Sequence, residues 1–513
     1  MKKFIAILLV LVALATMSFA AFTDEKDITG TYSAAVQTMV DAGVINGFED
    51  GTFRPKGTLT RAQAAKIITV LLEGEKADSV SAPAAGFVDV PAGNWAEKFV
   101  NYCAEKGIVA GVGNGKFDPN GELKGAQWAK MLLVAYGHDA AELTGDKWFS
   151  NTQKAIKEKG LGTNAHISDS VTTREKACQL AYNFYLEYTL LAAVPYEETT
   201  VSFANGKNMR LLGRAEATAD GVITNFPGDG VEFEIECGGV MELTVKAEYA
   251  GNYRLIVDGK PMDTRPSHPT GTPKALPLGE FVEPGKHNIR IIQDNDMSSS
   301  GYVNTLQTLT LRADEKTMKA TEAKKLYVEF VGDSITAGVG VFPDGNNLQG
   351  NSAYYGYSYQ TALNLDADYA LIAKGGLALA KLASSTPKVF GKELYLAQNA
   401  YKDEARAATF KNADVVVLAL CTNDARDNEE QFVQKLNELV DTVKAKNPKA
   451  KVVCICNLMN DKYIDEIMAV NDPAKGVYSL KMKQDRKGGA NHPLYTVCAE
   501  NAKTLADFIK TIL

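Results

Sequence analysis

Residues 328–339 read V-E-F-V-G-D-S-I-T-A-G-V. The run from Val328 to Val331 is rich in β-branched and aromatic residues and is halted by Gly332, which predicts a strand that ends in a tight turn. The turn puts Asp333 and Ser334 at the carboxyl end of that strand, where open α/β sheets hold their ligand sites. We therefore expect Ser334 to be exposed beside backbone N–H groups, a setting that suits an activated nucleophile.

Two more strand-like runs and one histidine follow in the last third of the chain. Residues 370–373 precede the sequence Lys374-Gly375-Gly376, and residues 415–420 precede Cys421-Thr422-Asn423-Asp424. Histidine occurs at positions 138, 166, 268, 287 and 492, so only His492 follows Ser334. A serine that needs a base in its own domain therefore has a single histidine candidate.

This ordered set resembles the SGNH (GDSL-type) hydrolases, whose four sequence blocks supply Ser, Gly, Asn and His, and the resemblance covers about residues 325–513. It implies a flavodoxin-like α/β/α domain with a parallel sheet, acting as a serine carboxylic-ester hydrolase without metal or cofactor. Ser334 would be the nucleophile and His492 the general base. The Ser334 N–H, the Gly375 N–H and the Asn423 side chain would form the oxyanion hole, with Gly376 as the rival for the glycine position.

The sequence departs from the family pattern at two positions. Cys421 stands where the family usually has Gly, and Gly489 stands where it usually has the Asp that orients the histidine. A Ser–His dyad is therefore the more economical interpretation. The Nδ1 atom of His492 then needs another partner, either a backbone carbonyl or Asp485.

Residues 22–190 contain an internal repeat. Gly43-Val44-Ile45 and Phe53-x-Pro55 recur 64 positions later as Gly107-Ile108-Val109 and Phe117-x-Pro119. Apolar residues at helical spacing on either side of each Gly-rich turn predict a helix–turn–helix in each copy. A third, degenerate copy runs from Trp148 to Glu175.

The repeat resembles three tandem S-layer homology domains, at about 22–73, 87–140 and 146–190. Such all-α domains attach proteins to pyruvylated secondary polymers of bacterial cell walls. The family's T-R-A-E signature appears at residues 60–63, 124–127 and 173–176. Arg61 and Arg174 suit the binding of a carboxylate or phosphate, and Lys124 supplies charge in the second copy, where Gly125 replaces the Arg. The alternative is a helical module that only spaces or solubilises.

Residues 200–315 change character. Apolar residues alternate with polar ones at 231–237 and at 241–247, with turn residues between them, and this period predicts an all-β sandwich. A β-sandwich directly before a Ser/Gly/Asn/His hydrolase resembles the jelly-roll half of carbohydrate esterase family 2, over about residues 200–513. The family removes acetyl groups from plant-type polysaccharides, and several members rely on a Ser–His dyad.

Size and charge limit the other possibilities. The chain has 513 residues, which predicts several domains, and a net charge of −7, which gives no reason to expect nucleic acid as a partner. Residues 1–20 have the basic start, apolar run and small-residue end of a secretory signal peptide. After cleavage we expect a secreted protein at the cell wall with no stable membrane insertion. The seven cysteines show no metal-ligand spacing, and we predict no disulfide framework.

The combined hypothesis is a cell-surface carbohydrate O-acetylesterase that acts on a xylan- or mannan-like polysaccharide through a Ser–His acyl-enzyme. Two alternatives stay open: a deacetylase of the bacterium's own cell-wall polymer, and a catalytically inactive carbohydrate-binding or S-layer protein. Tyr354, Tyr355 and Tyr357 would either stack a sugar ring near the site or belong to the core.

Overall fold

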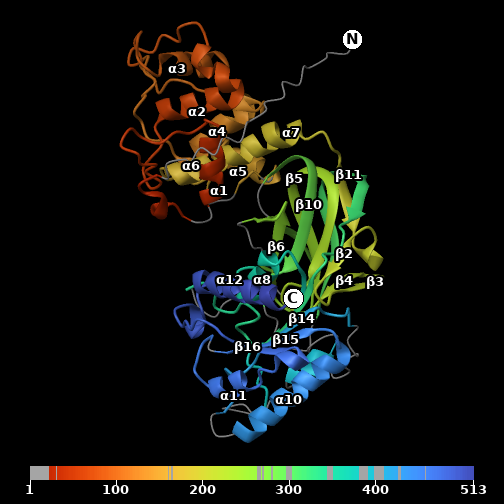
Figure 1. Ribbon diagram of the computed structural model, residues 1–513. Helices are drawn as coiled ribbons and strands as arrows, with labels where there is room; N and C mark the ends of the chain where they lie inside the picture. Colours follow the sequence, from red (N-terminus) through yellow and green to blue (C-terminus); the bar gives the residue numbers. More distant parts are fainter. Residues whose placement is uncertain are drawn as a thin grey trace. The chain divides into compact units, whose positions relative to one another are not determined.

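The protein divides into two compact units, Met1–Ala193 and Val194–Leu513, in a computed structural model (Figure 1). The structure describes residues 22–29, 32–159, 161–162, 166–262, 267–268, 271–278, 281–295, 303–343, 350–380, 391–397, 410–425, 429–456 and 458–513. The predicted signal peptide lies outside these residues. No helix among them is long and apolar enough to cross a membrane.

The first unit is built from pairs of helices, and no strand longer than an isolated bridge occurs in its described residues. The pairs are α1 (Ser33–Asp41) with α2 (Arg61–Glu73), α3 (Glu97–Glu105) with α4 (Gly125–Ala135), and α5 (Trp148–Glu158) with α6 (Arg174–Tyr185). Short 3₁₀ turns lie at Glu25–Asp27, Gly74–Ser79 and Ala140–Leu143, and a π turn at Leu186–Leu190 leads into α7 (Leu191–Ala193). The helix–turn–helix predicted for each copy is therefore present in all three.

The second helix of each pair begins at the signature motif, and in the first two copies side chains of the motif cap the helix. The Thr60 hydroxyl accepts a hydrogen bond from the Gln63 N–H (3.3 Å), and the Gln63 side chain accepts one from the Thr60 N–H (3.1 Å). In the second copy the Gln127 side chain accepts from the Lys124 N–H (3.0 Å).

Backbone hydrogen bonds at these helix starts join the three copies in a closed ring. The Arg61 N–H donates to the Gly121 carbonyl of the second copy (2.9 Å). The Gly125 N–H donates to the Ser170 carbonyl of the third (3.1 Å), and the Arg174 N–H donates to the Gly57 carbonyl of the first (2.8 Å). The loop of the next copy thus accepts hydrogen bonds from backbone N–H groups at each helix start that have no partner within the helix.

The second unit begins with a large antiparallel sheet, green in Figure 1. Its main strand order is β3-β4-β11-β5-β10-β6-β7, and β1, β2, β8 and β9 pair at its sides. The bounds are β1 (Glu198–Ser202), β2 (Arg210–Leu212), β3 (Glu216–Thr218), β4 (Gly221–Thr224), β5 (Gly230–Ala247), β6 (Gly251–Val257), β7 (Lys260–Pro261), β8 (Ser267–His268), β9 (Gly271–Pro277), β10 (Val282–Gln293) and β11 (Asn304–Ala320).

The alternating runs at 231–237 and 241–247, which the sequence separates into two strands, form the single strand β5. Gly239 has a φ of 82°, and the register between β5 and β11 shifts beside it, from Thr310↔Glu242 to Arg312↔Gly238. The glycines therefore mark a β-bulge inside one long strand instead of a turn between two.

The second sheet has five parallel strands in the order β13-β12-β14-β15-β16. Numbered along the chain, this is the 2-1-3-4-5 order of flavodoxin-like folds, with its switch point between β12 and β14. The strands are β12 (Tyr327–Gly332), β13 (Asp368–Ala373), β14 (Val415–Ala419), β15 (Lys451–Cys456) and β16 (Val477–Lys481), and the helices are α8 (Tyr357–Asn364), α9 (Gly391–Leu396), α10 (Glu429–Lys446), α11 (Ile464–Ala469) and α12 (Tyr495–Ile512).

Helices cover both faces of this sheet. Val416 and Leu418 of β14 pack in one core with α9, α10 and α11, while Val415 and Val417 pack in another with α8 and α12. Burial on both faces explains why these strands read as continuous apolar runs. The seven cysteines are all buried and unpaired.

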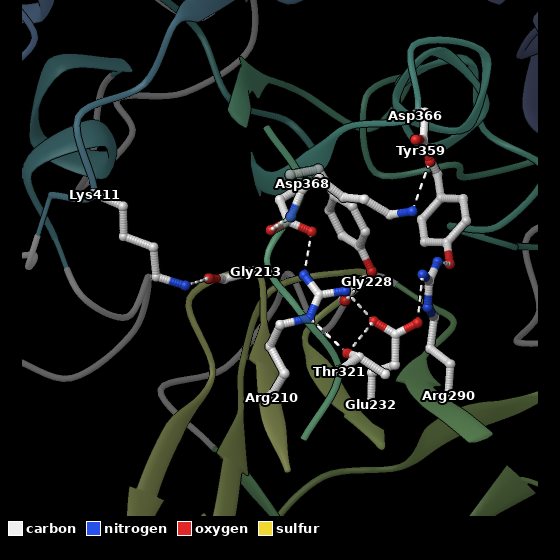
Figure 2. A network of polar contacts seen from close by, with 12 residues as sticks. Arg210, Gly213, Gly228, Glu232, Arg290, Thr321, Tyr359, Asp366, Asp368 and Lys411 are labelled. Carbon is white, nitrogen blue, oxygen red and sulfur yellow. Dashed lines mark hydrogen bonds and ion pairs between the residues drawn. The ribbon is translucent and has the colours of Figure 1, made fainter. Parts of the chain in front are cut away.

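A polar network joins the two sheets (Figure 2). The Glu232 carboxylate of β5 is ion-paired with Arg210 of β2 and with Arg290 of β10 (2.9 Å). Arg210 also pairs with Asp368 at the start of β13, and Arg290 donates to the Tyr359 hydroxyl of α8 (2.9 Å). The two arginines thus hold the antiparallel sheet against the parallel-sheet domain.

A second contact between the sheets centres on Asp294, which follows β10 and is fully buried. Its carboxylate accepts from Arg254 Nε (2.9 Å), from the Ser352 hydroxyl (2.9 Å) and from the Tyr354 N–H (2.9 Å). Its carbonyl accepts from the Ala353 N–H (3.0 Å). The loop that leads into α8 is therefore bound by the residue that follows β10 of the antiparallel sheet.

Replacing Asp294 with Ala should strongly destabilise the second unit, because the Arg254 charge is left buried without its partner. Removing one member of a buried pair costs about 3–5 kcal/mol. Scanning calorimetry of the full chain should show a lower unfolding temperature for the transition of this unit. Glu500→Ala, which removes an exposed pair with Lys483, is the matched control and should cost no more than about 1 kcal/mol. Equal effects of the two substitutions would contradict the role given to Asp294.

Candidate functional site

Ser334 lies in a compact turn directly after β12. Gly332 ends the strand, and a Cβ there would come within 2.0 Å of the Thr336 hydroxyl oxygen, so the turn needs glycine at this position. The Ala337 N–H donates to the Asp333 carbonyl (3.1 Å), and the Val339 N–H donates to the Ser334 carbonyl (2.9 Å). Ser334 is half-buried in this turn and not exposed as the sequence predicted.

His492 meets Ser334 directly. Its Nε2 atom lies 2.8 Å from Ser334 Oγ, and its Nδ1 atom lies 3.2 Å from the Gly489 carbonyl oxygen. A carbonyl only accepts hydrogen bonds, so Nδ1 carries the proton and Nε2 is free to accept the serine hydroxyl proton. This is the arrangement that a general base needs.

The orienting partner of His492 is thus a backbone carbonyl, one of the two possibilities left open by the sequence. The carboxylate of Asp485, the other possibility, instead accepts from the Leu494 N–H (2.9 Å). Gly489 supplies the carbonyl because residues 490 and 491 adopt left-handed backbone, with φ of 51° and 63°, and turn the chain back on itself.

Gly340 makes room for this loop. The Gly489 N–H donates to the Gly340 carbonyl (2.8 Å) and to the Phe342 carbonyl (3.0 Å). A Cβ on Gly340 would lie 2.2 Å from the Gly489 carbonyl oxygen and 2.9 Å from the His492 Cβ. Gly340 was not among the residues predicted from the sequence, although the G-V-G spacing at 338–340 after the serine indicates tight backbone packing.

The predicted oxyanion donors follow the two strands that flank β12. Gly375 comes two positions after β13, and Asn423 comes four positions after β14. The Asn423 amide donates to the Leu377 carbonyl (3.0 Å) and, at 3.5 Å, to the carboxylate of Asp333. Gly375 is half-buried, whereas its rival Gly376 is exposed with a φ of 73°.

Two buried aspartates support these loops. Asp424 accepts from the Leu379 N–H (2.9 Å) and the Ala380 N–H (2.7 Å), which ties the loop after β14 to the loop after β13. Asp333 accepts from the Ile335 N–H (2.9 Å). Burial, together with the nearby charge of Asp424, raises the pKa of Asp333 to about 7.

Tyr354, Tyr355 and Tyr357 differ in how deeply they are buried. Tyr357 is fully buried with its hydroxyl 2.8 Å from that of Thr336, and Tyr354 is 7% exposed, so both belong to the core. Tyr355 is partly buried. Cys421 is also buried, and burial raises the pKa of its thiol.

In the first unit, the two signature arginines reach into the neighbouring copy. Arg61 donates to the Phe117 carbonyl (2.8 Å) and the Ala110 carbonyl (2.7 Å). Arg174 is buried and donates to the Phe53 carbonyl (2.9 Å) and the Asn46 carbonyl (3.1 Å).

The second copy has no room for this arginine. A Cβ on Gly125 would lie 2.4 Å from the His166 carbonyl oxygen of the third copy. Lys124 beside it is partly exposed and ion-paired with Asp169 (2.9 Å).

A cavity of about 350 Å³ opens beside Arg61. Gln127 and Lys130 of α4 and Trp148 of α5 line it together with Arg61. It therefore combines two cations with an aromatic ring. Arg174 and Lys124 do not line this cavity.

Comparisons with known families agree with this organisation. Residues 330–509 match the model of the GDSL-like Lipase/Acylhydrolase family, and residues 21–65 and 86–129 match that of the S-layer homology domain. The chain combines S-layer homology domains with a GDSL-like acylhydrolase domain. The third repeat, at 146–190, is not covered by the matched residues and stays a prediction from the sequence.

Two of the curated relatives are named as surface proteins. The Surface-layer 125 kDa protein of Lysinibacillus sphaericus is 29% identical over 315 residues, which cover 61% of this chain and 22% of that protein. The Cell surface protein of Thermoanaerobacter kivui is 38% identical over 145 residues, covering 27% of this chain and 19% of that protein. The chain thus spans about a fifth of the length of these relatives. The matches indicate association with the cell surface.

Solved structures resemble the chain in fold. A family two carbohydrate esterase from Cellvibrio japonicus has a TM-score of 0.54 at 18% identity, covering 62% of this chain and 98% of its own. An acetyl xylan esterase from the rumen bacterium Butyrivibrio proteoclasticus has a TM-score of 0.53 at 16% identity, covering 61% and 98%. At these identities the likeness shows a shared fold.

The acylhydrolase domain should gain activity as pH rises through a pKa below 6.5. Burial lowers the pKa of His492 from its usual 6.5, and a general base acts only when neutral. The measurement is kcat/KM for 4-nitrophenyl acetate between pH 4.5 and 9. Asp333→Asn removes the other group that titrates nearby, so the rise should persist in that variant. Loss of the rise in Asp333→Asn would assign it to Asp333 instead.

Proposed function

We propose that the protein is a cell-surface carbohydrate O-acetylesterase that hydrolyses acetyl esters on a polysaccharide through an acyl-enzyme. The observation that carries the proposal is the 2.8 Å contact between Ser334 Oγ and His492 Nε2 at the carboxyl rim of the parallel sheet. The fold shared with carbohydrate esterases and the GDSL-like match support the ester chemistry.

In the proposed reaction His492 takes the proton of Ser334 as Oγ attacks the acetyl carbonyl carbon. The developing oxyanion accepts hydrogen bonds from the backbone N–H groups of Ser334 and Gly375 and from the Asn423 amide. One such donor contributes about 3–4 kcal/mol to the transition state. The bond to the sugar oxygen then breaks, and His492 returns the proton to that oxygen. Water repeats the sequence on the acetyl-serine and releases acetate.

The dyad works without a carboxylate because the Gly489 carbonyl holds the reactive tautomer of His492. A neutral carbonyl stabilises the imidazolium less than a carboxylate does. Ester hydrolysis asks less of the base than amide hydrolysis, because an alkoxide is a better leaving group than the anion of an amine.

Ser334→Ala should lower kcat for both 4-nitrophenyl acetate and acetylated xylan by at least about a thousandfold, since the nucleophile is removed. Asn423→Ala, which keeps the nucleophile, should lower kcat by about 10²–10³ and still react with a fluorophosphonate probe. Undiminished turnover by Ser334→Ala would remove that residue from the mechanism. Absence of probe labelling in the unaltered protein would favour an inactive carbohydrate-binding protein.

A second candidate substrate is the O-acetylated cell-wall polymer of the bacterium itself. The S-layer homology matches favour it, because a wall-bound esterase meets that polymer first. Acetate release from purified wall, compared with release from xylan and glucomannan at equal acetyl content, separates the two substrates.

For attachment, we assign the secondary cell-wall polymer to the cavity beside Arg61, where Lys130 adds a second cation and Trp148 an aromatic wall. Arg174 and Lys124 remain candidates, but Arg174 is buried and neither residue lines this cavity.

Arg61→Ala and Lys130→Ala should each weaken binding of the full chain to purified walls by about tenfold, as expected for the loss of a charge-assisted contact. This binding is measured by cosedimentation of the full chain with purified walls, before and after extraction of the secondary polymer. Lys154→Ala is the matched control, because that lysine is exposed on α5 and pairs only loosely with Glu158 (3.8 Å). Unchanged binding by Lys130→Ala would exclude the cavity.

A further inference from the structure

One aromatic side chain stands out on the surface of the second unit. Tyr495 is 43% exposed, and it is the only aromatic residue in the described part of this unit that is largely open to solvent. Other exposed large apolar side chains of the unit, such as Leu363 and Met468, are aliphatic. A single exposed ring needs no explanation by itself, but the position of this one is unusual.

Tyr495 lies three positions after His492, at the first residue of α12. Its N–H donates to the Val341 carbonyl (2.9 Å). The next residue, Phe342, uses its carbonyl to accept from the Gly489 N–H (3.0 Å). The two segments that carry Tyr495 and Phe342 are therefore the same segments that hold the imidazole against Ser334.

Three rings form one cluster at this place. The ring centroids of Tyr495 and Phe342 are 5.6 Å apart, those of Tyr495 and Tyr355 are 6.2 Å apart, and those of Phe342 and Tyr355 are 5.4 Å apart. Phe342 and Tyr355 are both partly buried. The exposed ring of Tyr495 is thus held by two rings beneath it.

The base of this cluster is tied to a buried carboxylate by hydrogen bonds. The Tyr355 N–H donates to the Ser352 hydroxyl (3.4 Å), which in turn donates to the buried Asp294. The Arg254 guanidinium lies 5.1 Å from the Tyr355 ring centroid. A ring that is held in place before binding loses little conformational entropy when a ligand covers it.

We infer that Tyr495, supported by Phe342 and Tyr355, forms a stacking subsite for a pyranose ring next to the acetylated sugar. The inference rests on the proposed function and names its substrate class as a polymer of pyranose units. The C–H face of a pyranose is apolar, and a large aromatic side chain with a polar tip suits it better than an aliphatic one. Small aryl or alkyl acetates reach Ser334 without covering this subsite.

The test compares two substrates in the full chain. Tyr495→Ala should lower the ratio of kcat/KM for acetylated xylan or glucomannan to kcat/KM for 4-nitrophenyl acetate by about tenfold, mainly through KM for the polymer. Tyr495→Phe keeps the ring and should keep the ratio within about twofold. Met468→Ala, an exposed apolar residue on α11, is the matched control. An unchanged ratio in Tyr495→Ala would overturn the inference.

A binding measurement separates this inference from the proposed catalysis. In the Ser334→Ala background, calorimetric titration with unsubstituted β-1,4-linked hexasaccharides of glucose, xylose and mannose should show about tenfold weaker binding when Tyr495→Ala is added. Any binding by the first unit is common to both proteins. If Ser334→Ala keeps full esterase turnover but Tyr495→Ala still weakens binding, the mechanism fails and the subsite stands. If hexasaccharide binding is equal with and without Tyr495→Ala, the subsite fails.

Discussion

The buried carboxylate of Asp294 is the contact on which the candidate active site depends. Asp294 directly follows β10 of the antiparallel sheet, yet its carboxylate accepts hydrogen bonds from the Ser352 hydroxyl and the Tyr354 N–H of the neighbouring domain. Ser352 in turn donates its N–H to the Gly338 carbonyl (2.8 Å), in the turn that carries Ser334. Moving the loop before α8 away from Asp294 would leave a buried charge with fewer partners, which costs free energy. The residue after β10 therefore helps to hold the turn that carries Ser334 in place.

Backbone geometry takes the place of a missing side chain at the dyad. Without a carboxylate at position 489, the imidazole of His492 is oriented by a carbonyl, and that carbonyl points correctly only because residues 490 and 491 adopt left-handed backbone. The contact also needs Gly340, where no side chain fits. The chain thus lacks the family's Asp at position 489 and has tight backbone packing at Gly340.

In the first unit, one sequence motif serves both assembly and the proposed binding. Arg61 and Arg174 reach across to backbone carbonyls of the next copy, and backbone hydrogen bonds at the three helix starts link the copies in a ring. Where a close approach of the third copy fills that space, the motif carries Gly125 instead. Arg61 borders an open cavity, whereas Arg174 is buried, so the arginine side chains of two similar motifs differ in their access to a ligand.

The sequence by itself determined strands β12, β13 and β14, the helical repeat, and the residues of the candidate dyad. Those strands are buried on both faces, so their apolar runs, ended by glycine or polar residues, are visible without any partner. The edge strand β16 is only partly buried and was not predicted. The sequence predicted two strands where the structure has the single strand β5, because a bulge and a turn both place glycines between two alternating runs. Only the tertiary structure decided what orients His492, which tyrosines are core, and that Tyr495 lies in the open, since each depends on contacts between segments far apart in the chain.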